Sequence, residues 1–254
     1  MKFKQYLNEG RTKSSNLTDV LDIAHFNCKN YMKMLINSKK YSIYRGVESF
    51  GDYYGYIDSN KGRGRKSAYT RNYTTLLIDN LPSWKGWPKR SKGIVCSTDR
   101  DYAYDYGDIY YVIPFDNALV GVAPKEDIFV SFKFLKGEVV RQFNTWLFRL
   151  FELFEIKEPK TYNDLKKAFK HMYNTVHDDM ESWKQFKPAI FKYNIFDSKD
   201  YMNRLDNLLN PNKNGFKMGV KNIKPNREVW IQGECLMVDE DEINTFLDGY
   251  KNGL

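Results

Sequence analysis

The sequence predicts an α+β protein in which a strand-rich core is interrupted by a block of helices. Short runs rich in β-branched and aromatic residues, which are typical of strands, occur before residue 125 and again after residue 227. Between them, apolar side chains recur at helical spacing over roughly 70 residues, which is within the size range of a small subdomain. The order of strands, helices and strands predicts a helical insertion into a β-rich core.

The first predicted element is an amphipathic helix over residues 17–37, with Asn16 or Thr18 as its candidate cap. Its apolar positions recur at helical spacing: Leu17, Val20, Leu21, Ala24, Cys28, Met32 and Leu35.

Strand-like runs follow this helix, separated by loops. The Gly-rich run at 60–66 predicts a loop, and the period of residues 73–81 is compatible with either a helix or a strand. The runs that predict strands are "YSIYRGV" (41–47), "GIVCST" (93–98), "IYYVIPF" (109–115) and "ALVGVAP" (118–124).

The helical block begins with an apolar stripe over 138–156 and reaches a stop at Pro159. Thr161 and Asp164 have the spacing of a capping box, so a second helix is predicted after them, and a third over 198–209. Strand character returns in "EVWIQGECLMV" (228–238), before a short helix over 241–250. The predicted organisation is an N-terminal peptide (1–10), a first core part (11–135), a helical insertion (136–221) and closing elements of the core (222–254).

Cysteine and histidine usage excludes several classes of site. Three cysteines without paired spacing do not suit a disulfide framework or a structural zinc site. Three scattered histidines do not suit a histidine-rich metal centre, so we expect no metal. A reducing compartment follows from the cysteine count. The sequence contains no apolar run of membrane-spanning length and its N-terminus has no apolar signal region, so no membrane partner is expected.

The basic residues are concentrated in one window. Residues 60–93 contain a single acid, Asp79, and carry the whole formal net charge of +8. A solvated basic loop is one interpretation, and a surface that faces the phosphates of a nucleotide or nucleic acid is the favoured one. The nine basic residues are Lys61, Arg63, Arg65, Lys66, Arg71, Lys85, Lys89, Arg90 and Lys92.

Three separated motifs carry a family resemblance. Arg45 lies at a predicted strand end within "IYRGV", Ser97 and Thr98 end "GIVCST", and Glu228 opens "EVWI". In this order they resemble the Arg / Ser-Thr-Ser / Glu signature of the toxin-like mono-ADP-ribosyltransferases. The resemblance covers residues 17–130 and 222–240 within a few residues and implies a split β-sandwich core.

The resemblance implies that NAD⁺ is the donor and that nicotinamide is released. Glu228, Arg45 and Ser97 would be the catalytic residues, and a fixed carboxylate suits the oxocarbenium-like transition state of this cleavage. The expected NAD⁺-binding residues are Arg45, Ser97, Thr98, Tyr102, Tyr106, Arg71 and Arg90. Ordinary alternatives are a surface ion pair for Arg45, strand-end solvation for Ser97 and Thr98, core packing for the tyrosines and solvated surface for Arg71 and Arg90.

A second glutamate competes for the catalytic role. The family has Gln or Glu two residues before its catalytic Glu, and Gln232 precedes Glu234 in this way, whereas Asn226 precedes Glu228. Glu228 is favoured because two predicted strands follow it. Asn226 would then contact the acceptor. Its short side chain, together with Asp99 in the place of the third hydroxyl, leaves the acceptor open between protein, DNA and RNA.

The first ten residues, "MKFKQYLNEG", resemble the capsid-targeting peptides of T-even-type phage internal proteins, which are cleaved after a Leu-x-Glu triplet, here Leu7-Asn8-Glu9. This implies packaging in a phage virion and action in the host bacterial cytoplasm; without it, a cytoplasmic protein is expected. The rival functions are a non-catalytic basic nucleic-acid-binding protein, with contacts through Lys61, Arg63, Arg65, Lys66, Lys89, Arg90 and Lys92, and a capsid-packaged protein on a degenerate transferase fold.

Overall fold

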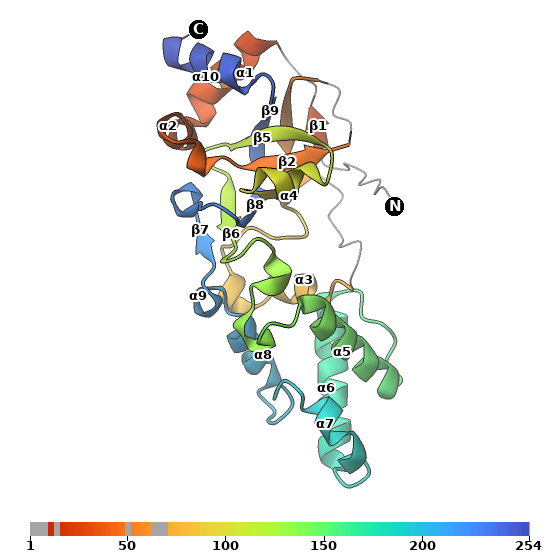
Figure 1. The fold of residues 1–254 in the computed structure, drawn as a ribbon. Coiled ribbons are helices and arrows are strands. Elements are labelled where there is room, and N and C mark those ends of the chain that lie inside the picture. The colour runs from red at the N-terminus through yellow and green to blue at the C-terminus, as the bar shows by residue number, and fades with distance from the viewer. Residues whose placement is uncertain (1–9, 13–15, 49–51, 62–70, 254) are drawn as a thin grey trace. The chain divides into compact units, whose positions relative to one another are not determined.

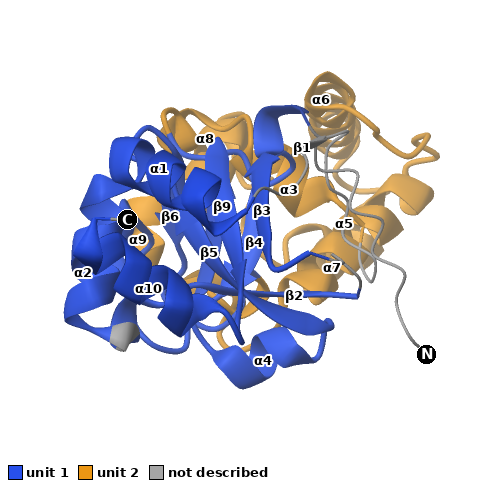
Figure 2. Ribbon diagram, turned by 90° about the horizontal axis from the view of Figure 1, so that it is seen from above, with its two compact units in different colours: residues 1–65, 87–128, 216–254 blue, residues 66–86, 129–215 orange. Residues whose placement is uncertain are grey.

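The chain forms two compact units in the computed structural model, which describes residues 10–12, 16–48, 52–61 and 71–253. Unit 1 comprises residues 1–65, 87–128 and 216–254, and unit 2 comprises 66–86 and 129–215 (Figure 2). Residues 66–86 were predicted to belong to the first part of the core, but they belong to unit 2.

Unit 1 is built on one antiparallel sheet with the strand order β1-β3-β9-β5-β2-β4-β8-β6-β7. The mixed α+β character predicted from the sequence is confirmed. The strands are β1 (Gly10–Thr12), β2 (Tyr44–Val47), β3 (Tyr54–Asp58), β4 (Ile94–Ser97), β5 (Asp108–Pro114), β6 (Leu119–Val122), β7 (Lys217–Met218), β8 (Glu228–Gln232) and β9 (Glu234–Asp239).

Two central strands are buried over most of their length. Six of the seven residues of β5 and four of the five of β8 are buried. By contrast, β2 and β4 are joined through a single residue pair, Tyr44 with Ser97. The sheet is therefore continuous but has a narrow junction, and the predicted catalytic residues lie along it.

The helices of unit 1 are α1 (Leu17–Asn27), α2 (Lys29–Asn37), α4 (Arg100–Tyr104) and α10 (Ile243–Asn252). Figure 1 shows α1 and α10 side by side. They approach closely at Gly249, where a Cβ atom would lie 2.8 Å from Cδ1 of Leu21. Their apolar faces and that of α2 join the sheet in one core, which includes Val20, Met32, Leu35, Val112, Ile113, Val229, Leu236 and Phe246.

The single helix predicted over 17–37 is wrong in one respect, because it breaks into α1 and α2 at Cys28. Asp116, in the turn after β5, explains the break. Its backbone N–H donates to the carbonyl of Asn27, and its carboxylate accepts the N–H of Asn30. Of the two candidate caps, Asn16 caps α1 by accepting the N–H of Asp19.

Unit 2 is helical and aromatic. The ambiguous segment 73–81 is helical over Tyr73–Ile78, and Thr161 and Asp164 form the predicted capping box. Tyr193 packs edge to face against Phe143 and Trp146, which is a favourable aromatic geometry. The helices of unit 2 are α3 (Tyr73–Ile78), α5 (Val140–Leu153), α6 (Tyr162–Asp178), α7 (Lys187–Ile190), α8 (Tyr201–Leu209) and α9 (Pro211–Asn214).

Short 3₁₀ turns connect several elements of the chain. They span Lys39–Tyr41, Ser59–Lys61, Pro82–Trp84, Ile128–Val130, Lys133–Leu135, Lys184–Phe186 and Val220–Asn222.

Candidate functional site

The three predicted catalytic residues lie on neighbouring strands of unit 1. Ser97, at the end of β4, is directly opposite Glu228 on β8 and opposite Tyr44 on β2, and Arg45 follows Tyr44. The fractional exposures of Arg45, Ser97 and Glu228 are 7%, 4% and 6%. A cation, a hydroxyl and a carboxylate thus lie buried on three neighbouring strands, and we call these three residues the β2–β4–β8 cluster.

Arg45 is buried, so the surface position considered from the sequence is wrong. Its Nη1 donates to the carbonyl of Val95 at 2.9 Å. The backbone beside it is crowded by α4, because a Cβ atom on Gly46 would lie 2.0 Å from the carbonyl oxygen of Ala103. Only glycine fits at position 46, and its absence of a side chain lets α4 lie directly on β2.

The hydroxyl motif organises the end of β4. The Ser97 hydroxyl accepts the N–H of Asp99 at 2.9 Å. The Thr98 hydroxyl donates to the carbonyl of Lys224 at 2.7 Å and accepts the N–H of Arg227 at 2.8 Å. Thr98 therefore fastens the turn that leads into β8, immediately before Glu228.

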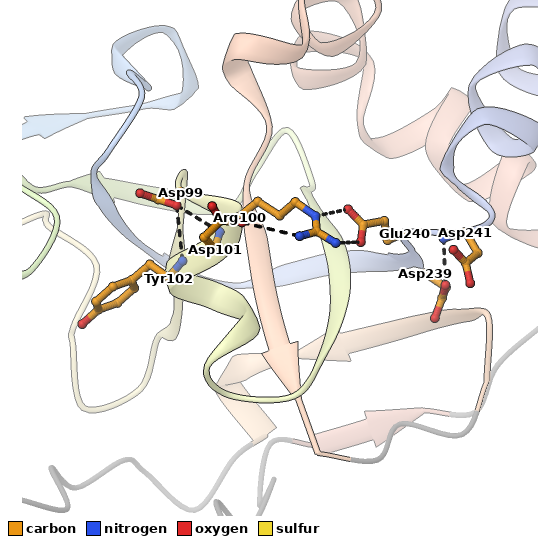
Figure 3. Close-up of polar contacts among 7 residues, drawn as sticks. All are labelled: Asp99, Arg100, Asp101, Tyr102, Asp239, Glu240 and Asp241. Carbon is orange, nitrogen blue, oxygen red and sulfur yellow. Dashed lines mark hydrogen bonds and ion pairs between the residues drawn. The ribbon is translucent and has the colours of Figure 1, made fainter.

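Asp99 replaces the third hydroxyl of the family motif and has a local structural task. Its Oδ1 accepts the backbone N–H groups of Asp101 and Tyr102 at 3.0 and 3.3 Å, as Figure 3 shows. This is the N-cap arrangement, in which a side-chain oxygen satisfies the first free donors of a helix. Asp99 thereby starts α4 directly after the hydroxyl motif.

Glu228 is enclosed by the segment that follows β6. Its backbone N–H donates to the carbonyl of Lys125, and its carbonyl accepts the N–H of Ala123. Its carboxylate accepts the N–H of Ile128 at 3.2 Å. The hydrogen bonds to Lys125 and Ala123 hold the backbone of Glu228, and the N–H of Ile128 orients its carboxylate.

Arg90 is the charged partner of Glu228. Its Nη2 lies 3.2 Å from each carboxylate oxygen, and the two side chains are only 8% and 7% exposed. The turn that carries Arg90 is fastened to β8, because Trp230 donates from Nε1 to the carbonyl of Pro88 and Gln232 accepts the N–H of Lys89. Arg90 was predicted to contact NAD⁺ or to lie on a solvated surface; it is buried against the predicted catalytic carboxylate.

Tyr102 and Tyr106 form an exposed aromatic pair beside this cluster. Their rings are 37% and 43% exposed and their centroids lie 6.0 Å apart. They are therefore available to a ligand and do not fill the core. Partial burial, the charge of Asp127, contact with Tyr106 and the charge of Glu228 together raise the pKa of Tyr102, which keeps its hydroxyl protonated.

The helix that presents Tyr102 is tied to the end of β9. Arg100 donates from Nε and Nη2 to the two carboxylate oxygens of Glu240, each at 2.6 Å. In Figure 3 the Tyr102 ring points away from this pair. The two-nitrogen contact with Glu240 raises the pKa of Arg100. The same contact holds α4 with the Tyr102 ring directed away from Glu240.

The remaining predicted site residues of unit 1 are exposed or engaged elsewhere. Asn226 is exposed and has a left-handed backbone with φ of 54°, a conformation that asparagine tolerates well. Glu234, the rival of Glu228, opens β9 opposite Asp58 and accepts a hydrogen bond from the Tyr56 hydroxyl. Glu234 lies on β9, whereas Ser97 pairs with Glu228 on β8.

The basic window is distributed over both units. Lys61 pairs with Asp58 at 3.5 Å. Arg71 belongs to unit 2, where its Nε lies 3.4 Å from Glu158 and its guanidinium lies 3.2 Å from the centre of the Phe148 ring. Lys85, Lys89 and Lys92 are exposed. Arg63, Arg65 and Lys66, which were predicted to contact nucleic acid, lie outside the described residues.

Sequence reasoning did not foresee that Arg90 pairs with Glu228 or that residues 123–128 enclose the carboxylate. Arg90 stands between Lys89 and Ser91, and Lys92 follows. No apolar periodicity distinguishes the one inward-facing cation of this turn from its exposed neighbours. The only signal was its membership of the basic window.

Comparison of the chain with protein-family models, curated proteins and solved structures finds no match. Within the described residues, no cluster of three or more His, Cys, Asp or Glu side chains is arranged to hold a metal ion. In that same part of the chain, no helix has both the length and the apolar character needed to cross a membrane.

Proposed function

We propose that the chain is a mono-ADP-ribosyltransferase that transfers ADP-ribose from NAD⁺ to a macromolecule of a bacterial host and releases nicotinamide. One observation carries this proposal: Ser97 is paired with Glu228 on one side and with Tyr44, the neighbour of Arg45, on the other. Ser97 and Glu228 are 131 positions apart in the sequence, and their pairing beside the strand of Arg45 supports the combination that the family resemblance implies.

The order of the elements supports the same interpretation. Arg45 lies on β2, the hydroxyl motif ends β4, and α4 follows with two exposed tyrosines. Glu228 opens β8, the first of two closing strands. The single residue pair between β2 and β4 is the kind of junction expected in a split β-sandwich, the fold that the resemblance implies.

The residue types suit the proposed reaction. The bond between C1′ of the ribose and the nicotinamide nitrogen breaks, the electron pair leaves with nicotinamide, and C1′ develops oxocarbenium character. Glu228 would stabilise this positive charge electrostatically, and Arg45 would hold phosphate or ribose oxygens. A nucleophilic atom of the acceptor then bonds to C1′ and loses its proton.

Asn226 is the expected acceptor contact, since it is exposed and stands two residues before Glu228. An amide donates and accepts hydrogen bonds but carries no charge. It therefore favours acceptors that are recognised by hydrogen bonding over a guanidinium, which would be matched by a carboxylate.

We place the acceptor in a bacterial host because of the N-terminal resemblance to phage capsid-targeting peptides, and we propose packaging in a virion on the same ground. Residues 1–9 lie outside the described residues. Gly10–Thr12 form β1, whose backbone pairs with β3. Cleavage after Glu9 would leave this strand in the mature chain.

The buried contact between Arg90 and Glu228 favours a second candidate, a capsid-packaged or nucleic-acid-binding protein on a degenerate transferase fold. In that case the ion pair would be part of the core, and the exposed Lys89 and Lys92 would contact a polyanion.

Incubation of the protein with NAD⁺ labelled in the adenylate moiety and a bacterial lysate tests the two candidates. A transferase labels a macromolecule and releases nicotinamide, and protease and nuclease digestion of the product identifies the acceptor class. Glu228→Gln is the matched negative control because it keeps the shape of the side chain. Salt-dependent binding of nucleic acid without nicotinamide release would instead support the second candidate.

A further inference from the structure

The ion pair between Arg90 and Glu228 is buried, whereas the two arginine–glutamate pairs compared with it below are partly exposed to solvent. Both of its side chains are less than a tenth exposed, at 8% and 7%. The side chains of Arg71 and Glu158 are 40% and 50% exposed, and those of Arg100 and Glu240 are 46% and 30% exposed. A charge withdrawn from water depends on its partner far more than an exposed one does.

The contact is nevertheless a long one. Nη2 of Arg90 is 3.2 Å from each oxygen of Glu228, whereas charge-assisted contacts of this kind are typically about 2.7–2.9 Å. Arg100 reaches Glu240 at 2.6 Å through two nitrogens. Arg90 thus meets Glu228 at a longer distance than Arg100 meets Glu240.

The pairing also conflicts with the proposed chemistry. A carboxylate stabilises an oxocarbenium through its negative charge. A guanidinium beside both oxygens opposes that charge at short range. Glu228 can act on a ribose at full strength only when the positive charge of Arg90 is balanced by another anion.

The backbone of Arg90 is fixed, so any exchange of partner falls to its side chain. The neighbouring residues Pro88 and Lys89 are hydrogen-bonded to Trp230 and Gln232 of β8, at 2.8 and 2.7 Å. The rest of the turn is closed by the N–H of Gly93, which donates to the carbonyl of Lys89. Arg90 lies beside these anchored residues, so an exchange of partner would involve its side-chain torsions and not its backbone.

We propose that Arg90 exchanges Glu228 for the diphosphate of the bound donor, so that the donor itself releases the carboxylate for catalysis. The identity of the diphosphate as that of NAD⁺ rests on the proposed function. A guanidinium binds phosphate oxygens as well as carboxylate oxygens, and a diphosphate carries more negative charge than one carboxylate. Glu228 and the diphosphate thus compete for one cation, and Arg90 makes the catalytic charge available only with the donor in place.

Inorganic pyrophosphate is the probe that tests this competition, with calorimetry at low salt as the measurement. Arg90→Gln should weaken pyrophosphate binding on the order of tenfold or more, the usual effect of losing a charged hydrogen bond. Glu228→Gln should strengthen binding several-fold, because it removes the competing anion. Lys251→Gln, the control, removes an exposed cation of α10 that lies outside the basic window, and it should change binding by no more than about twofold.

Arg90→Lys covers the case in which Arg90→Gln fails to fold. It keeps the charge but lacks the planar fork, and should bind pyrophosphate with intermediate affinity. If Glu228→Gln leaves pyrophosphate affinity unchanged or lowers it, the pair is structural and the exchange is refuted.

Pyrophosphate binding requires no turnover, so this test is separate from that of the proposed function. If the variants bind pyrophosphate as predicted but the protein releases no nicotinamide, the proposal of partner exchange by Arg90 stands and the proposed transferase activity is rejected. If the protein releases nicotinamide but the variants bind pyrophosphate with the same affinity as the unmodified protein, the transferase proposal stands and the exchange of partner by Arg90 is rejected.

Discussion

Ser97 and Glu228 are Cα partners across the antiparallel pair of β4 and β8, and both are almost completely buried. A hydroxyl motif that ends one strand thus lies beside the carboxylate that opens another, 131 positions later in the sequence. The pairing fixes the strand register, because a shift of one residue would turn Glu228 to the opposite face of the sheet.

Removal of the Ser97 hydroxyl tests this relationship. Ser97→Ala would leave the N–H of Asp99 without the acceptor that it now has at 2.9 Å, which we expect to cost about 1–3 kcal/mol of unfolding free energy. Nicotinamide release should fall as well, because Asp99 starts α4 beside the site. Urea unfolding and NAD⁺ turnover measure the two effects. Ser97→Thr, which keeps the hydroxyl, should lose less stability, and equal losses in the two variants would contradict this role.

The close approach of α4 to β2 gives a second prediction. Gly46→Ala would drive a Cβ atom to 2.0 Å from the carbonyl oxygen of Ala103, so α4 must move. We expect a loss of at least about 1–3 kcal/mol, as for other overpacked sites, and impaired NAD⁺ binding through Tyr102 and Tyr106. Gly249→Ala is the control: its Cβ would meet only the flexible end of Leu21, at 2.8 Å. Thermal unfolding of both variants should therefore show a much larger loss for Gly46→Ala.

The exposed part of the basic window is tested without Arg90, because that residue is buried. Lys89→Ala and Lys92→Ala together should weaken association with a polyanion and flatten its salt dependence, since each phosphate contact contributes to the slope. Titration of single-stranded DNA over a range of salt concentrations measures this. An unchanged slope would mean that these lysines are only solvated surface.

Alkaline pH should destabilise unit 1 through its partly buried tyrosines. Burial and the hydrogen bond to Glu242 raise the pKa of Tyr54 from 10.0 to about 12. The unfolded tyrosine loses its proton first, so the native state binds more protons between these values. Stability is then fully present below pH 10 and falls as the pH rises towards 12. Tyr54→Phe should make the fall shallower in urea unfolding at pH 9 to 11.5, and an identical fall in both proteins would contradict the assignment.

The elements that sequence periodicity predicted well are those with one strong pattern. The stripe over 138–156 became α5, and "EVWIQGECLMV" became β8 and β9. The helix over 17–37 was predicted without its break, because the cause of the break, Asp116, is distant in sequence. β3 was not predicted: its "YGYID" carries a central glycine and a terminal acid, and its pairing with β9 could not be inferred from local pattern.

In the candidate site, too, local sequence patterns predicted some features and long-range contacts determined others. The positions of Arg45, Ser97 and Glu228 on strands could be predicted, since each motif is adjacent to an apolar run. The pairing of Arg90 with Glu228 could not, because it depends on how the turn at 87–93 is fastened to Trp230 and Gln232. Long-range hydrogen bonds of this kind do not produce a periodic pattern in the sequence, so they cannot be predicted from it.

The last prediction separates the two glutamates. Glu228→Gln keeps the side-chain shape but removes the charge that would face the oxocarbenium, and loss of one preorganised electrostatic group costs on the order of 10²–10³ in turnover. We therefore expect nearly complete loss of both ADP-ribose transfer and NAD⁺ hydrolysis, with NAD⁺ binding retained. Glu234→Gln should do much less, because Glu234 lies on β9 and accepts a hydrogen bond from Tyr56. Asn226→Ala should lie between them and impair transfer more than hydrolysis, since its exposed amide would contact the acceptor and not the donor.

Nicotinamide release and product labelling, measured side by side for the three variants with thermal melts as the folding control, decide between the two glutamates. An inactive Glu234→Gln beside an active Glu228→Gln would assign the catalytic carboxylate to β9 and overturn the role given to the β2–β4–β8 cluster.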